Sequence, residues 1–272
     1  MYPWIIADGQ LFNVQAVKMP WQDQGVLYGY GVFETILVKQ SRPIFLKAHV
    51  DRLKYSAGQL GIPLPDSLAD LDQAVQSLVI ANQSPDVVLN IYLTGGDRDS
   101  NSPRWWMGVR KLPDDHPLSI TVQKEQFART LLDRFKSMSY LKPILEKKRA
   151  SDFDDVLLYG KSGRLYETTM ASVFLVMDKI IFTPKSLFVL PGIVRKCLLK
   201  KGAYFGFEII EKPLFQADLQ NADEIFLTNS LKGIALISQT NGYPHLKSGP
   251  ISHSIKKAYD LFLESDNTGA FS

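Results

Sequence analysis

The sequence predicts a mixed α/β protein of two domains, and three features carry that prediction. Its 272 residues, 45% hydrophobic and 22% charged, are enough for one large or two medium globular domains. Residues 109–117 hold two prolines and a charge cluster between apolar runs, which is typical of a linker. Beyond that segment, strand-like and helix-like runs alternate along the chain. We therefore expect one domain at residues 1–116 and another at 117–272.

The first domain is expected to begin as antiparallel sheet. Asp8 and Gly9 lie between the apolar runs 4–7 and 11–14, and this dipeptide predicts a tight hairpin because both of its positions tolerate positive φ. A glycine-rich loop then leads into a strand at 32–38 and a second hairpin. Apolar spacing predicts helices at 48–60 and 68–81 and a buried strand at 87–93.

The second domain is expected to alternate strands with helices. Short apolar runs predict its strands, at 118–122, 156–159, 173–177, 180–183, 207–212 and 224–228. Longer runs with helical spacing predict helices at 141–150, 193–204 and 255–263. This alternation is the pattern of an α/β domain.

Charge and composition argue against several classes of function. A net charge of +3 with scattered lysines does not predict nucleic-acid binding, and no metal site is predicted. No apolar run reaches the ~18 residues that span a bilayer. The single cysteine, Cys197, excludes an intrachain disulfide, and the first residues lack the basic start and apolar core of a signal peptide. We expect a cytoplasmic protein that acts on a small molecule.

The candidate chemistry rests on a lysine and a carboxylate. Lys136 lies among apolar and small hydroxyl residues, where desolvation lowers the pKa of an amine and frees it as a nucleophile. Glu167 follows the apolar strand at 156–159. Such a pair could serve pyridoxal phosphate, with the lysine bonded to the cofactor and the carboxylate on its ring nitrogen. A solvated lysine and a strand-end charge are the plainer alternatives, and Lys142 is a rival for the lysine.

The order of residues in several segments favours the cofactor site. Residues 136–141 read Lys-Ser-Met-Ser-Tyr-Leu, residues 163–167 read Gly-Arg-Leu-Tyr-Glu, and residues 28–35 read Tyr-Gly-Tyr-Gly-Val-Phe-Glu-Thr. Together with further matches between Asp23 and about Ile237, they resemble the fold-type IV pyridoxal phosphate enzymes. That family includes branched-chain and D-amino-acid aminotransferases and 4-amino-4-deoxychorismate lyase.

This resemblance implies a fold, a cofactor site and an assembly. It implies a small N-terminal and a larger C-terminal α/β domain, with pyridoxal 5′-phosphate at their junction, and a homodimer. Lys136 would carry the cofactor and Glu167 would contact its ring nitrogen. The implied phosphate ligands are Arg52 on the helix at 48–60, Gly192, Ile193 and Val194 at a helix start, and Thr228, Asn229 and Ser230 at a strand end.

The activity that the resemblance favours is 4-amino-4-deoxychorismate lyase, which would place the enzyme in folate biosynthesis. Residues 228–231, Thr-Asn-Ser-Leu, look most like the lyase branch. Gly95 and Gly96 stand where many members have Arg-Gly, so the carboxylate-binding arginine of D-amino-acid aminotransferases has no counterpart. A D- or branched-chain amino-acid aminotransferase is the alternative, and a non-catalytic protein of this fold is a third reading. Ser172 departs from the asparagine usual in the family.

Overall fold

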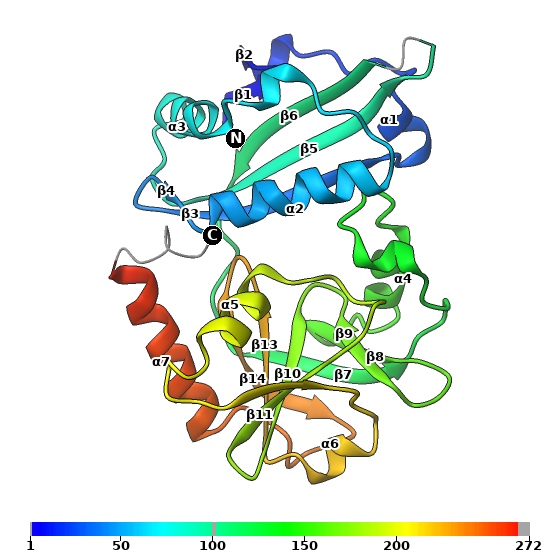
Figure 1. The fold of residues 1–272 in the computed structure, drawn as a ribbon, viewed down its shortest axis with the longest axis vertical. Coiled ribbons are helices and arrows are strands. Elements are labelled where there is room, and N and C mark those ends of the chain that lie inside the picture. Colours follow the sequence, from blue (N-terminus) through cyan, green and yellow to red (C-terminus); the bar gives the residue numbers. More distant parts are fainter. Residues whose placement is uncertain (1, 100–101, 266–272) are drawn as a thin grey trace. The chain divides into compact units, whose positions relative to one another are not determined.

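The computed structural model describes residues 2–99 and 102–265, which form two compact units (Figure 1). The described residues of the first unit are 2–99, 102–113 and 135–140, and those of the second are 114–134 and 141–265. Among the described residues, the chain passes from the first unit to the second, returns to the first at 135–140, and then enters the second again. The predicted domains, 1–116 and 117–272, stay a prediction about how the chain folds.

The first unit is built on an antiparallel sheet whose strand order is β2-β1-β6-β5-β3-β4. Its strands are β1 (Trp4–Ala7), β2 (Gln10–Asn13), β3 (Gly31–Lys39), β4 (Arg42–Pro43), β5 (Val87–Asp97) and β6 (Ser102–Arg110). Its helices are α1 (Gln24–Tyr28), α2 (Leu46–Gln59) and α3 (Leu71–Ala81), with 3-10 turns at Val14–Ala16 and Asp66–Leu68. Helix α2 packs on β3 through a stripe that includes Leu53 and Ala57. Side chains between α2 and β3 therefore lie in a buried layer.

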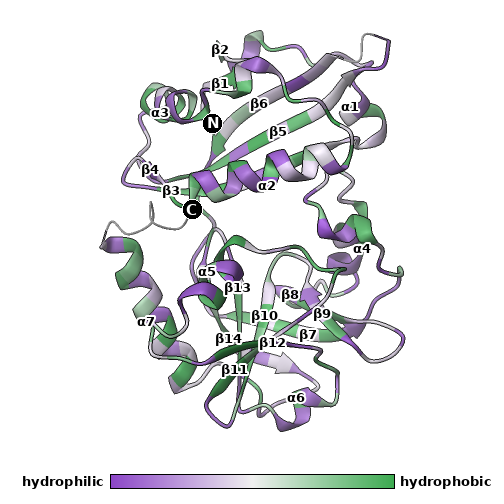
Figure 2. Cartoon of the chain, in the orientation of Figure 1, coloured by the Kyte–Doolittle hydropathy of each residue, from purple (hydrophilic) through white to green (hydrophobic). Residues whose placement is uncertain are grey.

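The second unit is built on a mixed sheet whose strand order is β12-β11-β10-β13-β14-β7-β8-β9. Its strands are β7 (Leu118–Lys124), β8 (Asp155–Tyr159), β9 (Leu165–Thr168), β10 (Ser172–Met177), β11 (Ile180–Pro184), β12 (Ile209–Lys212), β13 (Glu224–Asn229) and β14 (Gly233–Asn241). Its helices are α4 (Leu141–Lys148), α5 (Ile193–Lys201), α6 (Asp218–Asn221) and α7 (Pro250–Glu264), with a 3-10 turn at Leu131–Arg134. Strands β8, β10 and β13 are buried along most of their length, and each contains a continuous apolar run, at 156–158, 173–176 and 225–227, rather than an alternating pattern (Figure 2).

Most of the predicted elements are confirmed within a few residues. Asp8 and Gly9 join β1 to β2 at φ values of 48° and 88°, as a tight hairpin requires. The second hairpin joins β3 to β4. The helices predicted at 48–60, 193–204 and 255–263 correspond to α2, α5 and α7. The regularly spaced apolar residues that predicted these helices are therefore largely the residues that they bury.

Two expectations are wrong. The glycine-rich segment before β3 contains helix α1, because the Asp23 carboxylate accepts hydrogen bonds from Gly25 N (2.7 Å) and Val26 N (3.4 Å) and so caps the helix. The linker expected at 109–117 begins later, because β6 continues to Arg110 and pairs there with β5. Strands β6, β9 and β14 had no predicted counterpart.

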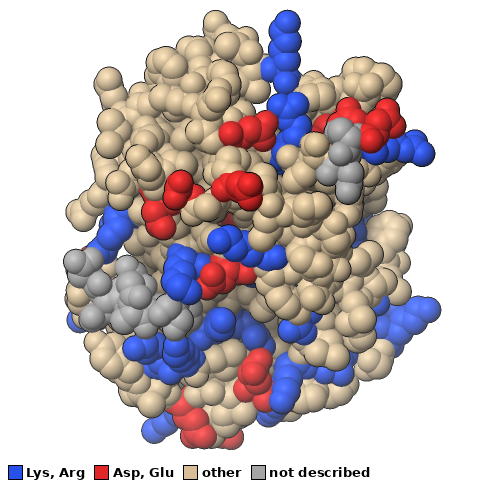
Figure 3. Space-filling view, turned by 45° about the horizontal axis from the view of Figure 1, so that its top comes forward, with Lys and Arg blue, Asp and Glu red and all other residues tan. Residues whose placement is uncertain are grey.

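The described residues also bear on membranes, metals and surface charge. No helix among them is long and apolar enough to cross a bilayer. A search of the same part of the chain finds no group of three histidine, cysteine or acidic side chains placed to hold a metal ion. On the face shown in Figure 3, Lys and Arg side chains are interspersed with Asp and Glu. That face therefore carries mixed charge rather than one basic patch.

Candidate active site

Lys136 lies on a short segment that extends the first sheet beside β3. Phe33 N donates to Lys136 O at 2.9 Å, and Met138 N donates to Gly31 O at 2.8 Å. The Lys136 Nζ lies 4.3 Å from the centroid of the Phe33 ring and 5.7 Å from that of Tyr140. The lysine side chain is half-buried. The amine predicted to carry the cofactor is therefore held against aromatic rings.

A row of aromatic side chains continues from Phe33 across the sheet. Phe33 is the register partner of Tyr92, and Tyr92 is the partner of Trp106. The ring centroids are 5.9 Å and 5.3 Å apart, with interplanar angles of 17° and 18°. Stacked rings on neighbouring strands stabilise the surface that they form. Lys136 thus lies beside a continuous aromatic wall.

Arg52 lies in the buried layer between α2 and β3, where Glu34 holds it. Its Nε donates to Glu34 Oε1 and its Nη2 to Glu34 Oε2, both at 2.7 Å. His49, one helical turn earlier, has its Nδ1 2.6 Å from Glu34 Oε2. The Nε2 of His49 is buried and has no hydrogen-bond partner among the described residues. One carboxylate therefore orients two basic side chains.

Burial and the two bases set the charges of this cluster. Burial alone would raise the pKa of Glu34, but Arg52 and His49 outweigh it and lower that pKa to about 2. Burial lowers the pKa of His49, and Glu34 opposes that change. The carboxylate is therefore ionised at neutral pH and holds the guanidinium through two parallel hydrogen bonds. A guanidinium fixed in one orientation suits an anion ligand.

Glu167 is held by Arg129, a residue that sequence reasoning missed. Arg129 Nη1 donates to Glu167 Oε1 at 2.6 Å and to Phe188 O at 3.1 Å. Leu190 N lies within hydrogen-bond distance of both carboxylate oxygens, at 3.3 and 3.2 Å. The guanidinium carbon of Arg129 also lies 5.0 Å from the centroid of the Tyr166 ring. Arg129 precedes Lys136 in an irregular segment without periodicity, so no sequence pattern pointed to it.

Arg129 is shared between two carboxylates. Its Nε also donates to Glu125 Oε2 at 3.0 Å. Burial raises the pKa of Glu167, while Arg129 and the Leu190 amide act in the opposite direction without cancelling the effect of burial. Burial alone would lower the pKa of Arg129, but Glu167 and Glu125 outweigh it and raise that pKa. A further cationic donor, such as a protonated ring nitrogen, would stabilise the Glu167 carboxylate.

The rival lysine, Lys142, takes part in the same network. Its Nζ donates to Asp133 Oδ1 at 3.0 Å and to Ala128 O at 3.2 Å, and it lies 3.9 Å from Glu125 Oε2. These contacts tie the first turn of α4 to the segment that precedes it. This arrangement favours a structural role for Lys142 and leaves Lys136 as the candidate for the cofactor.

Three polar groups converge where α5 begins. Gly192 is the residue before the helix, and as a glycine it has no side chain to cap the amides that follow it. A Cβ at Gly192 would lie 2.8 Å from Ser172 Oγ, so a side chain here would displace the Ser172 hydroxyl. Ser172 on β10 is the register partner of Thr228 on β13. The Oγ1 of Thr228 is buried, and the described residues offer it no hydrogen-bond partner.

We call Gly192, the amides of Ile193 and Val194, and the hydroxyls of Ser172 and Thr228 the anion cradle. The side chains of Ile193 and Val194 are apolar and buried, so these residues can contribute only their backbone N–H groups. Amides at the start of a helix carry the positive end of its dipole and bind anions. A buried hydroxyl without a partner indicates a polar group yet to be bound. The cradle therefore fits a phosphate.

Asn229 and Ser230 have a different setting from Thr228. Asn229 Oδ1 accepts hydrogen bonds from Leu231 N at 3.0 Å and Lys232 N at 2.9 Å. These bonds make Asn229 the first residue of the turn between β13 and β14. Ser230 is half-buried within that turn. Their role as phosphate ligands stays a prediction, with less structural support than that of Thr228.

The two glycines at the end of β5 leave no room for side chains. Gly96 has a φ of 70°, and a Cβ there would lie 1.6 Å from the backbone oxygen of Ser102. A Cβ at Gly95 would lie 2.4 Å from carbons of the Tyr30 ring. A side chain at either position would force the backbone or Tyr30 to move. The backbone at the end of β5 is therefore packed for glycine at both positions.

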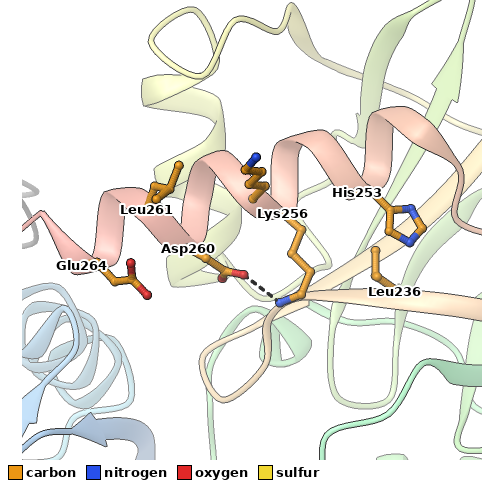
Figure 4. Close-up of a pocket in the computed structure, with 7 residues that line it drawn as sticks. Leu236, His253, Lys256, Asp260, Leu261 and Glu264 are labelled. Atoms are coloured by element: carbon orange, nitrogen blue, oxygen red, sulfur yellow. Dashed lines mark hydrogen bonds and ion pairs between the residues drawn. The ribbon is translucent and has the colours of Figure 1, made fainter.

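A shallow groove along α7 contains none of the predicted site residues. It is lined by Leu236 of β14 and by residues of α7 that include His253, Lys256 and Asp260 (Figure 4). Lys256 Nζ and Asp260 Oδ2 form an ion pair at 3.1 Å, so these two charges satisfy each other. The groove is therefore separate from the candidate site residues.

The structure places the predicted site residues in two groups. Lys136 and Arg52 belong to the first unit, whereas Glu167 and Thr228 belong to the second, as does the α5 start. Within the second unit, Leu190 connects Glu167 to the anion cradle. Its amide donates to the Glu167 carboxylate, and Leu190 itself lies two residues before Gly192. The acid and the anion cradle are thus joined by one short segment.

Comparison with known proteins adds an independent line of evidence. The family model described as Amino-transferase class IV matches residues 31–240. A putative branched-chain-amino-acid aminotransferase of Methanocaldococcus jannaschii is 28% identical over 94% of each chain. An aminodeoxychorismate lyase of Vibrio harveyi is 28% identical over 81% of this chain and 86% of its own. The crystal structure of a putative 4-amino-4-deoxychorismate lyase from Legionella pneumophila has a TM-score of 0.83 and 27% identity, covering 93% of this chain and 97% of that one.

Proposed function

Because the chain belongs to the class IV aminotransferase family, we propose that it is a 4-amino-4-deoxychorismate lyase, forming 4-aminobenzoate and pyruvate. The cofactor of the family is pyridoxal 5′-phosphate. When bound, this cofactor withdraws electrons from the carbon that carries the substrate amine and makes its proton acidic. The binding, orientation and proton transfer fall to side chains of the protein.

The cofactor phosphate is assigned to the anion cradle and to Arg52. The uncapped amides after Gly192 and the unpartnered Thr228 hydroxyl support the first assignment. The pairing of Arg52 with Glu34 supports the second, since it fixes the guanidinium before any ligand arrives. Ile193, Val194, Asn229 and Ser230 complete the proposed set of phosphate ligands.

Lys136 has two tasks in this proposal. It would hold the cofactor covalently through its amine, and that amine, once free, would remove the proton from the amine-bearing carbon of the substrate. The enolpyruvyl group then leaves with the electrons of its carbon–oxygen bond and is protonated to pyruvate. The rings of Phe33 and Tyr140 support this role because they lie beside the lysine amine, 4.3 and 5.7 Å from its Nζ, and restrict where it can point.

Glu167 is proposed to accept a hydrogen bond from the cofactor ring nitrogen and to keep it protonated. Arg129 and Leu190 N hold the carboxylate in one orientation. Its raised pKa reflects a buried charge that a cationic N–H donor would stabilise. The Glu167 carboxylate would therefore bind the ring most strongly when the ring nitrogen is protonated, which is the form that the chemistry requires.

One observation favours the lyase over D-amino-acid transfer, namely the packing of Gly95 and Gly96. Ser102 and Tyr30 occupy the space that side chains at these glycines would need. A carboxylate-binding arginine is therefore sterically disfavoured at this point of the chain. The Vibrio harveyi and Legionella pneumophila relatives named as lyases support the same choice.

An aminotransferase acting on branched-chain amino acids is the second candidate. The match to the Methanocaldococcus jannaschii protein over 94% of each chain favours it. Both reactions begin with the same proton transfer by Lys136 and differ in the step that follows. The residues named above therefore serve either activity, and product analysis separates them.

We further propose a cytoplasmic homodimer that serves folate biosynthesis. Support for self-association comes from large apolar side chains exposed together near α1, where Trp21 is 72%, Val26 53% and Tyr28 60% exposed. Exposed apolar patches often mark protein interfaces. Light scattering of the purified protein tests the dimer, since a monomeric mass at micromolar concentration would contradict it.

Product analysis tests the activity directly. Purified protein loaded with pyridoxal 5′-phosphate is incubated with aminodeoxychorismate, and separately with leucine or D-alanine plus 2-oxoglutarate. We expect 4-aminobenzoate and pyruvate from the first mixture and no glutamate from the others. Glutamate without 4-aminobenzoate would replace the lyase with an aminotransferase.

A further inference from the structure

Asp155 is a buried carboxylate that the proposed chemistry does not use. It is the first residue of β8 and only 2% exposed. Its Oδ1 accepts hydrogen bonds from Val156 N at 2.8 Å, Thr169 N at 3.2 Å and Thr169 Oγ1 at 2.6 Å. These donors are neutral. Burial raises the pKa of Asp155, and hydrogen bonds from Thr168 and Thr169 oppose that change.

A carboxylate in such a place is unfavourable for folding alone. A buried charge surrounded by neutral donors carries a larger desolvation penalty than a neutral amide that accepts the same hydrogen bonds. Residues that break a local packing rule tend to lie at functional sites. We therefore expect the role of Asp155 to lie in the segment that its carboxylate binds, which contains Thr169.

That segment is the turn from Thr168 to Ala171, which joins β9 to β10. Thr168 N and Oγ1 donate to Ala171 O at 2.9 and 3.0 Å, and Ala171 N donates to Thr168 Oγ1 at 2.9 Å. Thr169, in the middle of the turn, reaches Asp155 through both its amide and its hydroxyl. Asp155 thus ties the turn to the start of β8.

The two residues that flank this turn belong to the two halves of the candidate site. Glu167 precedes it and accepts a hydrogen bond from Leu190 N. Ser172 follows it, adjoins Gly192 and pairs with Thr228. The turn therefore sets the spacing between the acid and the anion cradle.

We propose that Asp155 is a positioning residue for the cofactor: through Thr169 it fixes the turn that spaces Glu167 from the anion cradle. The carboxyl group suits this task because one oxygen, Oδ1, accepts hydrogen bonds from Val156 N and from both the amide and the hydroxyl of Thr169. Its two bonds to Thr169 restrain the turn at its backbone and at its side chain. The inference rests on the proposed roles of Glu167 and the cradle, and it holds for a lyase or an aminotransferase.

The test measures cofactor affinity, which does not depend on turnover. Full-length protein freed of cofactor is titrated with pyridoxal 5′-phosphate, and the absorbance of the bound form is recorded. We expect Asp155→Asn, which keeps the shape but loses the charge, to raise the Kd about tenfold. Thr169→Val, which removes only the hydroxyl bond, should raise it by a smaller factor. Both variants should shift the absorbance, because Glu167 then meets the ring at a changed position.

Glu224 provides a matched control. It is a second buried carboxylate of the same unit with neutral donors, Ser252 Oγ at 2.7 Å and Gly249 N at 3.0 Å, but it caps α7 rather than the turn. Glu224→Gln should lower the melting temperature while the Kd stays within twofold of wild type.

The outcomes separate the two roles. An Asp155→Asn variant that loses stability as Glu224→Gln does, but keeps wild-type cofactor affinity and absorbance, would overturn the inference. If Asp155→Asn does not fold, Thr169→Val decides, and an unchanged Kd for that variant likewise overturns it. Cofactor affinity thus decides this inference, whereas the products formed from aminodeoxychorismate decide the proposed lyase activity.

Discussion

Each unit contains a buried arginine–glutamate ion pair, and the proposed cofactor ligand is the arginine in one pair and the glutamate in the other. In the first unit, Glu34 serves Arg52, and the arginine is the proposed cofactor ligand. In the second, Arg129 serves Glu167, and the glutamate is the proposed ligand. The supporting partner in each pair is a charged group that holds its counterpart in one orientation. The two pairs therefore use the same residue types with their proposed roles reversed, although Arg52 binds Glu34 through two hydrogen bonds and Arg129 binds Glu167 through one.

The number of basic partners explains why the two glutamates differ. Glu34 receives hydrogen bonds from Arg52 and contacts His49, so its pKa falls to about 2 despite burial. Glu167 has one cation, Arg129, which also binds Glu125, and burial leaves its pKa raised. A carboxylate that only has to orient an arginine can be fully compensated. A carboxylate that has to bind a further cation is only partly compensated, so its pKa stays raised until that cation is present.

The largest effect is expected at the lysine beside the first pair. Lys136→Ala should abolish the covalent link to the cofactor, because the variant lacks the amine that forms it. Lys142→Ala should keep the link, because Lys142 is bound to Asp133 and Ala128. Mass spectrometry after borohydride reduction detects the fixed cofactor. An adduct in Lys136→Ala but not in Lys142→Ala would move the site to Lys142.

The second pair predicts the next largest effect. Glu167→Gln should leave the cofactor bound but reduce turnover by ~10²-fold or more, because it removes a charge that stabilises the reacting ring. Glu146→Gln is the control: Glu146 is also buried in the second unit but binds Gln126 N and Arg149. It should lower stability and spare turnover in the folded fraction. Steady-state kinetics of Glu167→Gln at the wild-type rate would remove Glu167 from the mechanism.

The same comparison shows what the sequence could predict. Lys136, Glu167 and Arg52 are predicted site residues because each lies in a short run whose residue order resembles the family. Arg129 is not among them, because it lies in an irregular segment and meets Glu167, 38 residues away, only in the folded chain. Sequence patterns therefore point to candidate catalytic side chains more readily than to the side chains that orient them.

Local structure was predictable where the core imposes a period. The long amphipathic helices were found, whereas α1, with five residues, is too short to show a period and depends on the cap at Asp23. Strand β14 escaped notice because its second half, from Ser238 to Asn241, is polar. The convergence of Ser172 and Thr228 follows from strand pairing that no local pattern encodes.

Arg52 gives a sharper test of the first pair. Arg52→Ala should weaken pyridoxal phosphate binding by about 1.5–3 kcal/mol, or roughly ten- to a hundred-fold in Kd, because a charge-assisted contact is lost. Arg104→Ala is the matched control, since Arg104 pairs with Asp8 in the same unit and is 41% exposed. Cofactor titration compares the two. A Kd for Arg52→Ala within twofold of wild type would leave the anion cradle as the main phosphate site.

The smallest effect expected is on stability, and it isolates the orienting role of Glu34. Its folded pKa, about 2, lies below the ordinary value of 4.5. The ionised group therefore stabilises the fold above pH 4.5, and this contribution is lost as the pH falls toward 2. Between pH 6 and pH 3 the wild type should lose roughly 2 kcal/mol more unfolding free energy than Glu34→Gln, as measured by urea titration. Asp51→Asn, which breaks an exposed pair with Lys47 on the same helix, should follow the wild-type pH profile within about 0.5 kcal/mol. If Glu34→Gln also follows it, Arg52 and His49 do not hold the Glu34 charge, and the contrast between the two pairs fails.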